Sequence, residues 1–216
     1  MNARPSVPRL AAQLSDWDGD GDGDVSDLLE IDNSLVVLTD LTGVSRLQID
    51  SSKLEGVVLT GLVLDKFELT DSQCLKLEAA ALRTHKANLL RVALTDSRLT
   101  GAEFADASIE DCVFKNVKFD EAGFRFASFK RVRFEDCMLR QADFSNAKFE
   151  QVTFTGCDLD GTVFVSATCK DVDITTENLT TAKGILGLKG ATISEVQLMQ
   201  IAPLLAAELG FRVEGL

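Results

Sequence analysis

The chain has 216 residues, of which 45% are hydrophobic and 26% are charged, and its formal net charge is −12. This length predicts one folded domain with a sizeable core, and the negative charge argues against nucleic acid as a direct ligand. No apolar run approaches the roughly 18 residues of a membrane span, and the first residues lack the apolar stretch of a signal peptide. We therefore expect a cytoplasmic protein with no membrane contact.

The N-terminal segment, residues 1–43, lies outside the repeat that dominates the rest of the chain, and we expect it to cap one end of the fold. Its alternating Asp and Gly residues resemble part of an EF-hand calcium loop, with acids at the first, third and fifth positions and Gly23 at the sixth. The twelfth position, where that loop needs Glu, holds Leu29. Two interpretations stay open: a calcium loop that regulates or stabilises the fold, or a solvated acidic turn. The candidate calcium ligands are Asp18, Asp20, Asp22 and Asp24. We expect no other cofactor.

A five-residue period runs through the middle of the chain. From Val44 to Leu179 every fifth residue is uncharged and most are Leu, Ile, Val or Phe. Two residues earlier, a second register from Ala87 to Val172 holds only Ala, Val, Ser, Cys or Thr. A step of five would spread these residues over all faces of an α-helix, and it would alternate between the faces of a strand. The chain must therefore turn a corner in every pentad, with one small and one large residue facing inward.

The pentads at residues 102–106 (AEFAD) and 142–146 (ADFSN) resemble the A-(D/N)-L-x-x motif of the pentapeptide-repeat family. The resemblance covers about residues 42–182 and implies an all-β solenoid, a right-handed quadrilateral β-helix with four pentads per coil. We assign residues 44–183 to this β-helix. A step of four pentads then stacks phenylalanines in the core: Phe104, Phe114, Phe124, Phe134, Phe144, Phe154 and Phe164.

Two further features follow from a coil of four pentads. Large residues fill small slots, and small residues fill large ones, between residues 74 and 86, so we expect a bulge or loop there. Cys137 and Cys157 are one whole coil apart and should be neighbours in adjacent coils. We expect all five cysteines to be reduced thiols, because they form no Cys-x-x-Cys pair and the small slot suits a thiol.

Residues 184–216 leave the repeat and should form a C-terminal helical cap. Ser194 and Gln197 match a capping box that opens a helix of about residues 195–209, and Pro203 should kink or restart it. One stripe of this helix is apolar, formed by Leu198, Ile201, Leu205 and Leu209. Quinolone-resistance members of the family look similar at this end and dimerise through it, so the resemblance implies a homodimer.

Catalysis is not expected, because His85 is the one histidine and no nucleotide-binding loop or paired carboxylates mark a reaction site. The outward register instead gives a candidate interface on one side: Ala105, Phe126, Val163 and Val165. We therefore predict a non-catalytic scaffold for an unknown protein partner. The alternative implied by the resemblance is a DNA mimic that binds a type II topoisomerase, DNA gyrase. Alternating charges at Glu110 and Lys130 speak against the continuous negative field that a mimic needs.

Overall fold

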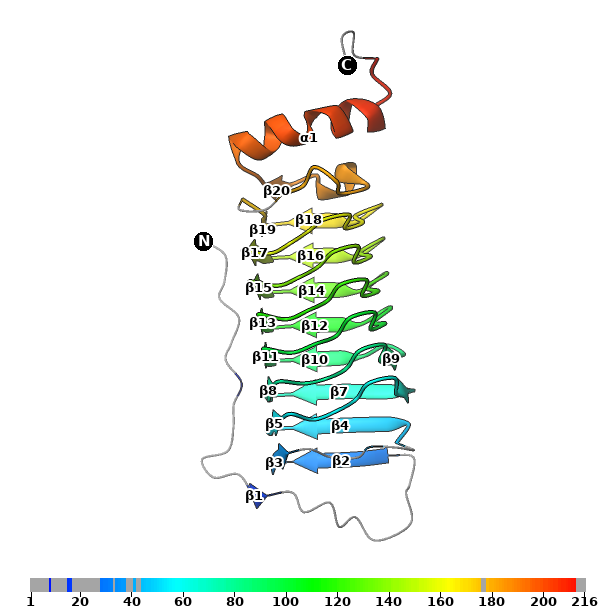
Figure 1. Ribbon diagram of the computed structural model, residues 1–216, viewed down its shortest axis with the longest axis vertical. Coiled ribbons are helices and arrows are strands. Elements are labelled where there is room, and N and C mark those ends of the chain that lie inside the picture. Colours follow the sequence, from blue (N-terminus) through cyan, green and yellow to red (C-terminus); the bar gives the residue numbers. More distant parts are fainter. Residues whose placement is uncertain are drawn as a thin grey trace.

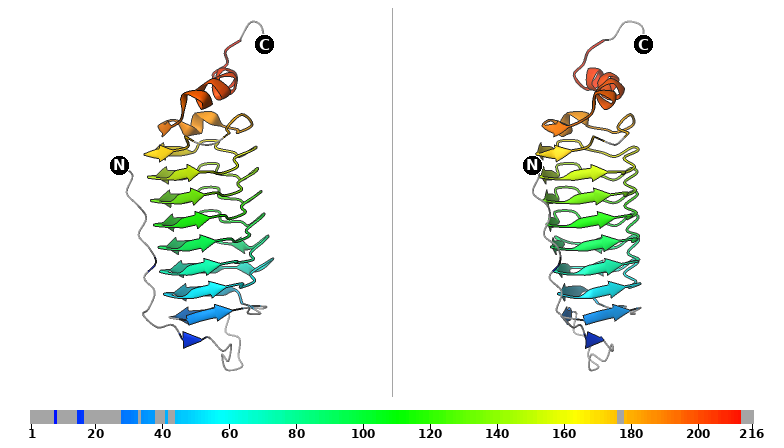
Figure 2. Two further views of the ribbon diagram at one scale, coloured as in Figure 1. Left: turned by 60° about the vertical axis from the view of Figure 1, so that its left-hand side comes forward. Right: turned by 90° about the vertical axis from the view of Figure 1, so that its left-hand side faces the viewer.

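Figure 1 shows a tall stack of rungs with a helix across its C-terminal end. The computed structural model describes residues 8, 15–16, 28–32, 34–37, 41, 44–175 and 178–212. Strands pair in parallel with the strands of the coils on either side, so the stack is a parallel β-solenoid. Figure 2 shows the same arrangement of level rungs from two further directions. The predicted all-β solenoid with a C-terminal helix is confirmed.

Two long sheets form two sides of the solenoid. Sheet A contains β1 (Ser15–Asp16), β3 (Ser34–Val37), β5 (Lys53–Glu55), β8 (Gln73–Leu75), β11 (Ala93–Thr95), β13 (Val113–Lys115), β15 (Arg133–Glu135), β17 (Thr153–Thr155), β19 (Val172–Asp173) and β20 (Ala191–Thr192). Sheet B contains β2 (Leu28–Asp32), β4 (Arg46–Asp50), β7 (Lys66–Thr70), β10 (Asn88–Leu90), β12 (Ser108–Glu110), β14 (Ser128–Lys130), β16 (Lys148–Glu150) and β18 (Thr168–Lys170).

The other two sides are narrower. Side C is a column of single bridges that runs from Val58 to Asp158. Side D begins with β6 (Val63–Leu64) and β9 (Arg83–Thr84), and its bridges continue up to Lys183. Four sides of one pentad each make up one coil. The register is constant from β4 to β19, where β4 pairs with β7, β10 with β12 and β14 with β16, each time with an offset of four pentads. The last pair, β19 with β20, is one residue closer in the sequence.

The first coil corrects the boundary expected at residue 43. Leu28 pairs with Arg46 and Leu35 with Lys53, so β2 and β3 already belong to the two sheets. Both pairs are two residues closer in the sequence than four pentads. The coil still closes, because the backbone ladder needs aligned strands rather than a fixed number of residues in the turns. The five-residue period missed this coil for that reason.

Each side buries one small and one large residue. Ala122 and Phe124, for example, are 0% and 1% exposed. The backbone groups beside them bond to the neighbouring rungs, where the Gly123 N–H donates to the Ala102 carbonyl at 2.9 Å and the Phe124 N–H donates to the Asp143 carbonyl at 2.8 Å. Hydrogen bonds between neighbouring coils thus satisfy the buried peptide groups of the stack.

The corners place one residue in the left-handed region. In the described part of the chain, nineteen non-glycine residues have φ between 47° and 61°, a conformation that Asn, Asp and Gly adopt most easily. Nearly all of these corner residues are polar, and among the described residues only Ala81 and Phe126 are apolar. Phe126 has the largest φ of the set, 61°.

The prediction of a bulge or loop between residues 74 and 86 was wrong. β8 pairs with β11 and β6 with β9 at the ordinary offset of four pentads. Leu77 and Leu82 fill small slots, while Ala79 and Thr84 fill large ones, and all four are buried. The exchange of large and small residues keeps the volume of the coil, which cores tolerate well. The Thr84 hydroxyl donates to the Glu103 carbonyl at 2.9 Å, so its polar group is satisfied.

The C-terminal end consists of a 3-10 helix, η1 (Ile185–Leu188), and α1 (Glu195–Glu208). The predicted capping box is present: Ser194 Oγ accepts from the Gln197 N–H at 3.2 Å, and Gln197 Oε1 accepts from the Ser194 N–H at 2.7 Å. α1 does not restart at Pro203, which lies inside it. Within the described part of the chain, no helix has the length and apolar character needed to cross a membrane.

Candidate interaction surfaces

The seven phenylalanines predicted for the core are at most 2% exposed, so they fill the rod rather than line a surface site. Phe144 stacks on Phe124 with ring centroids 5.1 Å apart and on Phe164 at 5.7 Å. Phe129 and Phe149 meet Phe144 edge-on at 5.6 and 5.4 Å. Such offset and edge-to-face contacts are the favoured geometries of aromatic pairs.

The predicted interface residues of side D lie on the surface and define what we call the side D patch: Ala105, Phe126, Val163 and Val165. Phe126 is 57% exposed and Val165 is 47% exposed, while Ala105 and Val163 are half-buried. Phe126 combines this exposure with a positive φ, which is rare for a bulky residue and costs of order 1 kcal/mol or more. The fold gains little from a phenylalanine at this corner.

The polar groups beside the side D patch are satisfied within the rod. Arg125 Nε donates to Asp143 Oδ2, and Asp143 Oδ1 accepts from the Ser145 N–H at 2.9 Å. Burial raises the pKa of Asp143, but the hydrogen bonds from Ser145 and Arg125 outweigh it and hold this pKa below its usual value. The charges of Arg125 and Asp143 therefore compensate each other beside Phe126.

The cap divides the apolar stripe predicted for α1. Ile201 is buried and Leu205 is half-buried against the last coil, whereas Leu198 and Leu209 are 52% and 57% exposed. The four residues do not share one environment, because α1 meets the solenoid through a neighbouring arc that includes Gln197, Ile201 and Leu204. Sequence reasoning also missed the apolar neighbours of the two exposed leucines. The exposed apolar side chains of this end, which we call the cap surface, are Leu186, Val196, Leu198, Met199, Leu209 and Phe211.

Polar contacts hold α1 to the solenoid near both of its ends. Gln197 Nε2 donates to the Ile174 carbonyl, and the Glu208 carboxylate accepts from the N–H groups of Ile185 and Leu186 at 2.9 and 3.0 Å. Between these contacts lies a hollow of about 310 Å³, in which Lys189 is the one charged lining residue. The hollow is lined by Ile185, Leu186, Leu188, Lys189, Gly190, Ala191, Ile193, Ile201 and Leu205.

Opposite charges pair from rung to rung along one edge of sheet B. Lys130 Nζ lies 3.2 Å from Glu110 Oε1, and Lys170 Nζ lies 2.6 Å from Glu150 Oε1. Arg131 also binds Glu110. Burial raises the pKa of Glu110, but hydrogen bonds from Arg131 and Lys130 bring it below its usual value, and the bond from Lys170 lowers the pKa of Glu150. This edge is locally neutral.

On side C, Asp120, Arg140 and Asp160 do not form a simple ladder of ion pairs. Arg140 donates through Nε to Asp158 in the neighbouring row, and Asp160 accepts from the Thr181 hydroxyl. The charge of Arg140 is still compensated by an acid of the next coil. These contacts favour a rod with locally balanced faces.

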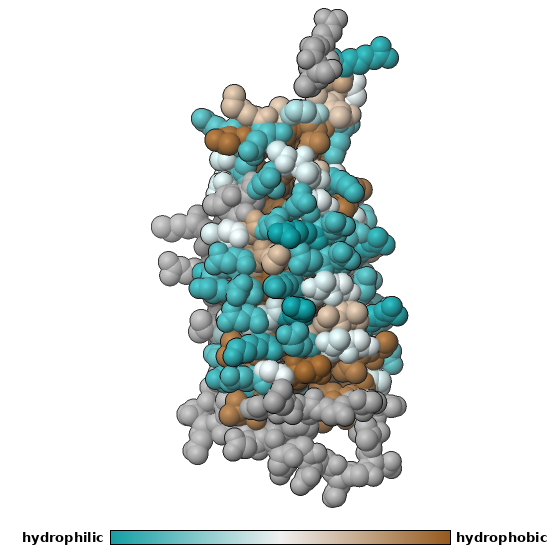
Figure 3. Space-filling view, viewed as in Figure 1, coloured by the Kyte–Doolittle hydropathy of each residue, from teal (hydrophilic) through white to brown (hydrophobic). Residues whose placement is uncertain are grey.

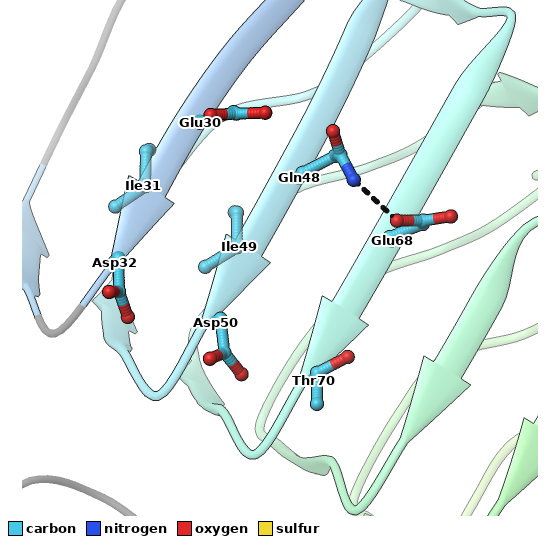
Figure 4. Close-up of a pocket in the computed structure, with 8 residues that line it drawn as sticks. All are labelled: Glu30, Ile31, Asp32, Gln48, Ile49, Asp50, Glu68 and Thr70. Atoms are coloured by element: carbon cyan, nitrogen blue, oxygen red, sulfur yellow. Dashed lines mark hydrogen bonds between the residues drawn. The ribbon is translucent and has the colours of Figure 1, made fainter.

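A second hollow, of about 450 Å³, lies on the first coils of sheet B and was not predicted. Figure 4 shows Glu30, Asp32, Asp50 and Glu68 along its strands, with the Gln48 amide donating to Glu68 Oε2 at 2.6 Å. The shorter first coil brings Asp32 beside Asp50, which a constant register of four pentads could not foresee. In the described ranges, no group of three or more His, Cys, Asp or Glu residues is placed to hold a metal ion.

The candidate calcium ligands Asp18, Asp20, Asp22 and Asp24 lie outside the described residues, so calcium binding stays a prediction. His85 is exposed on side D. Among the residues that the structure describes, His85 does not belong to a group of three or more side chains that could hold a metal ion.

Two family models match the chain. A "pentapeptide repeat region" model matches residues 127–201, and a model of eight pentapeptide repeats matches residues 87–125 and 97–136. A search of curated protein sequences finds no match. Among solved structures, a trypsin-treated form of QnrB1, a plasmid-mediated fluoroquinolone resistance protein, is 17% identical with a TM-score of 0.34, over 86% of this chain and 100% of that one.

Two further solved structures are similar. A pentapeptide repeat protein from the Arabidopsis thaliana thylakoid lumen is 20% identical with a TM-score of 0.32, over 52% of this chain and 68% of that one. Rfr23 from the cyanobacterium Cyanothece 51142 is 13% identical with a TM-score of 0.17, over 66% and 88%. At these identities and scores, the solved structures carry no argument about a partner.

Proposed function

The chain belongs to the pentapeptide-repeat family, and we propose that it is a non-catalytic scaffold, which dimerises through its cap surface and binds a further protein through its rod. The observation that carries this proposal is the gathering of exposed apolar side chains at one end of the rod. Figure 3 shows apolar residues at the α1 end and hydrophilic residues over much of the middle. A gathering of exposed apolar side chains is typical of interaction sites.

The chemistry of the cap surface favours a second copy of the chain as its occupant. α1 carries two charged residues, Glu195 and Glu208, and Glu208 is engaged by the backbone of η1. Met199 is 80% exposed and Phe211 is 67% exposed. A two-fold interface would bury both side chains in each of the two copies. Each side chain that is fully covered would add about 1.5–3 kcal/mol of hydrophobic free energy to association. Two such surfaces meet with little charge repulsion, although each copy carries a net charge of −12.

The oligomeric state of purified protein tests the dimer. We expect a dimer by light scattering at tens of micromolar and a monomer for Met199→Glu. Val63→Glu is the matched control, because Val63 is 59% exposed on side D near the opposite end of the rod. It should remain a dimer. A wild-type monomer, or a Met199→Glu variant that still dimerises, would overturn this part of the proposal.

The side D patch is the candidate surface for the further partner. Asn occupies the equivalent corner one coil later, at Asn146, with φ 60°. Phe126→Asn should therefore relieve backbone strain and leave the fold intact while removing the exposed ring. Affinity capture from the native host, followed by mass spectrometry, should recover a partner with the wild-type chain and lose it with Phe126→Asn. A partner retained equally by both chains would move the binding surface elsewhere.

DNA mimicry is the alternative role. The net charge of −12 favours it, but the ion pairs of sheet B and side C break the negative field along both faces. An exposed pair contributes little energy, yet it still cancels charge locally. We therefore prefer the scaffold, and a topoisomerase assay separates the two roles.

A further inference from the structure

Two of the five cysteines are stacked directly on one another, and the proposed scaffold role does not use them. Cys137 and Cys157 occupy the small slot of side C and are 1% and 5% exposed. Met138 and Asp158 form a parallel bridge, and the Asp158 N–H donates to the Cys137 carbonyl at 2.9 Å. This register holds the two cysteines at the same position of adjacent coils. Both are reduced in the structure.

The spacing of the coils fits a disulfide. Neighbouring strands lie about 4.8 Å apart, which is within the range of about 4.4–6.8 Å between the Cα atoms of disulfide-bonded cysteines. Both side chains face the axis of the rod. A hydrogen bond from the Cys157 thiol lowers the pKa of Cys137 and outweighs the burial that raises it.

The remaining cysteines have different surroundings. Burial raises the pKa of Cys74 and of Cys112 to about 12 and that of Cys169 to about 11. Their neighbours one coil away are not cysteines; for Cys112 they are Val92 and Val132. Only one cysteine pair of this chain is therefore in rung register.

We propose that Cys137 and Cys157 form a reversible disulfide, which links two adjacent coils covalently when hydrogen peroxide oxidises the protein. One sulfur attacks the peroxide and becomes a sulfenic acid, with release of one water. The second sulfur then attacks the sulfenic acid, forms the S–S bond and releases a second water. Two thiols and one hydrogen peroxide thus give one disulfide and two waters. A dithiol reductant restores both thiols by exchange.

The geometry of the stack suits reversibility. The Cβ atoms of in-register residues lie at about the strand spacing of 4.8 Å, slightly beyond the roughly 3.5–4.5 Å that a relaxed disulfide spans. Closing the bridge must draw the two coils together by a few tenths of an ångström. Strained disulfides are more easily reduced, and they are typical of regulatory rather than structural bonds.

Counting thiols on the full chain tests the proposal. The reduced native protein is treated with hydrogen peroxide, alkylated in denaturant and weighed intact. The wild type should fall from five alkylated cysteines to three, and a dithiol should restore five. Cys137→Ala and Cys157→Ala should each keep all four of their cysteines. Alanine is a safe replacement, because Ala142 fills the next small slot with 0% exposure.

A matched control and a second readout complete the test. Cys112→Ala removes an equally buried thiol and should fall from four alkylated cysteines to two. Oxidation should also slow hydrogen exchange of the Asp158 N–H, which bonds across the linked coils. Five thiols left in the wild type, a mass gain of oxygen instead of a bridge, thiol loss in Cys137→Ala, or unchanged exchange at Asp158 would each overturn the proposal.

Discussion

Truncating Phe144 to Ala should lower the free energy of unfolding by about 3–5 kcal/mol. Phe144 is 0% exposed and has four rings with centroids within 5.7 Å: Phe124, Phe149, Phe129 and Phe164. Removing its ring loses the burial of an aromatic side chain and the contacts with all four neighbours. The coils above and below are fixed by backbone hydrogen bonds, so they collapse poorly into the space. The upper part of the range is therefore expected.

Urea unfolding followed by circular dichroism measures this cost as a lower midpoint at an unchanged slope. Phe126→Ala is the matched control, because it deletes the same ring from a 57% exposed site, and it should change stability by less than about 0.5 kcal/mol. Phe144→Leu should cost less than about 1.5 kcal/mol, since Leu139 and Leu159 fill equivalent slots with 0% exposure. Equal losses for Phe144→Ala and Phe126→Ala would refute the assignment of inward and outward slots.

Two more predictions concern the alternatives. Millimolar calcium should change the melting temperature little or not at all; a large rise that Asp18→Ala abolishes would show that the acidic run is a true site. Purified protein at micromolar concentration should neither inhibit nor protect DNA gyrase in a supercoiling assay, because its faces are locally neutralised. An effect that Asp120→Ala or Asp160→Ala weakens would instead establish the DNA mimic and end the scaffold interpretation.

The core was predictable because inward slots accept a narrow range of side chains. A step of four pentads placed Phe104 on Phe124, and their rings stack at 5.6 Å. The first coil was not predictable from the same period, since its strands leave the register by two residues. The acidic hollow around Glu30 and Asp50 was missed for the same reason.

The surfaces were predictable in part. The outward register placed Phe126 on the surface, but a period carries no information on φ, so its left-handed backbone came from the structure. The spacing of Leu198 and Leu209 indicated an amphipathic helix without showing which arc would meet the solenoid. That arc depends on the polar contacts of Gln197 and Glu208, whose partners in the last coil are not encoded by helical spacing.

The constant spacing of the coils from β4 to β19 fixes the distance between the two ends of the rod. Because each coil contacts only its neighbours, a gain or loss of one whole coil would change the length without rearranging either end. Each such step moves the cap surface by about 4.8 Å relative to the first coil. A residue inserted inside a strand would instead shift the inward slots of its coil, whereas a turn can absorb a change of length, as the first coil does with two residues fewer. The distance between the ends can therefore vary only in whole coils, and an assembly that touches both ends would measure their number.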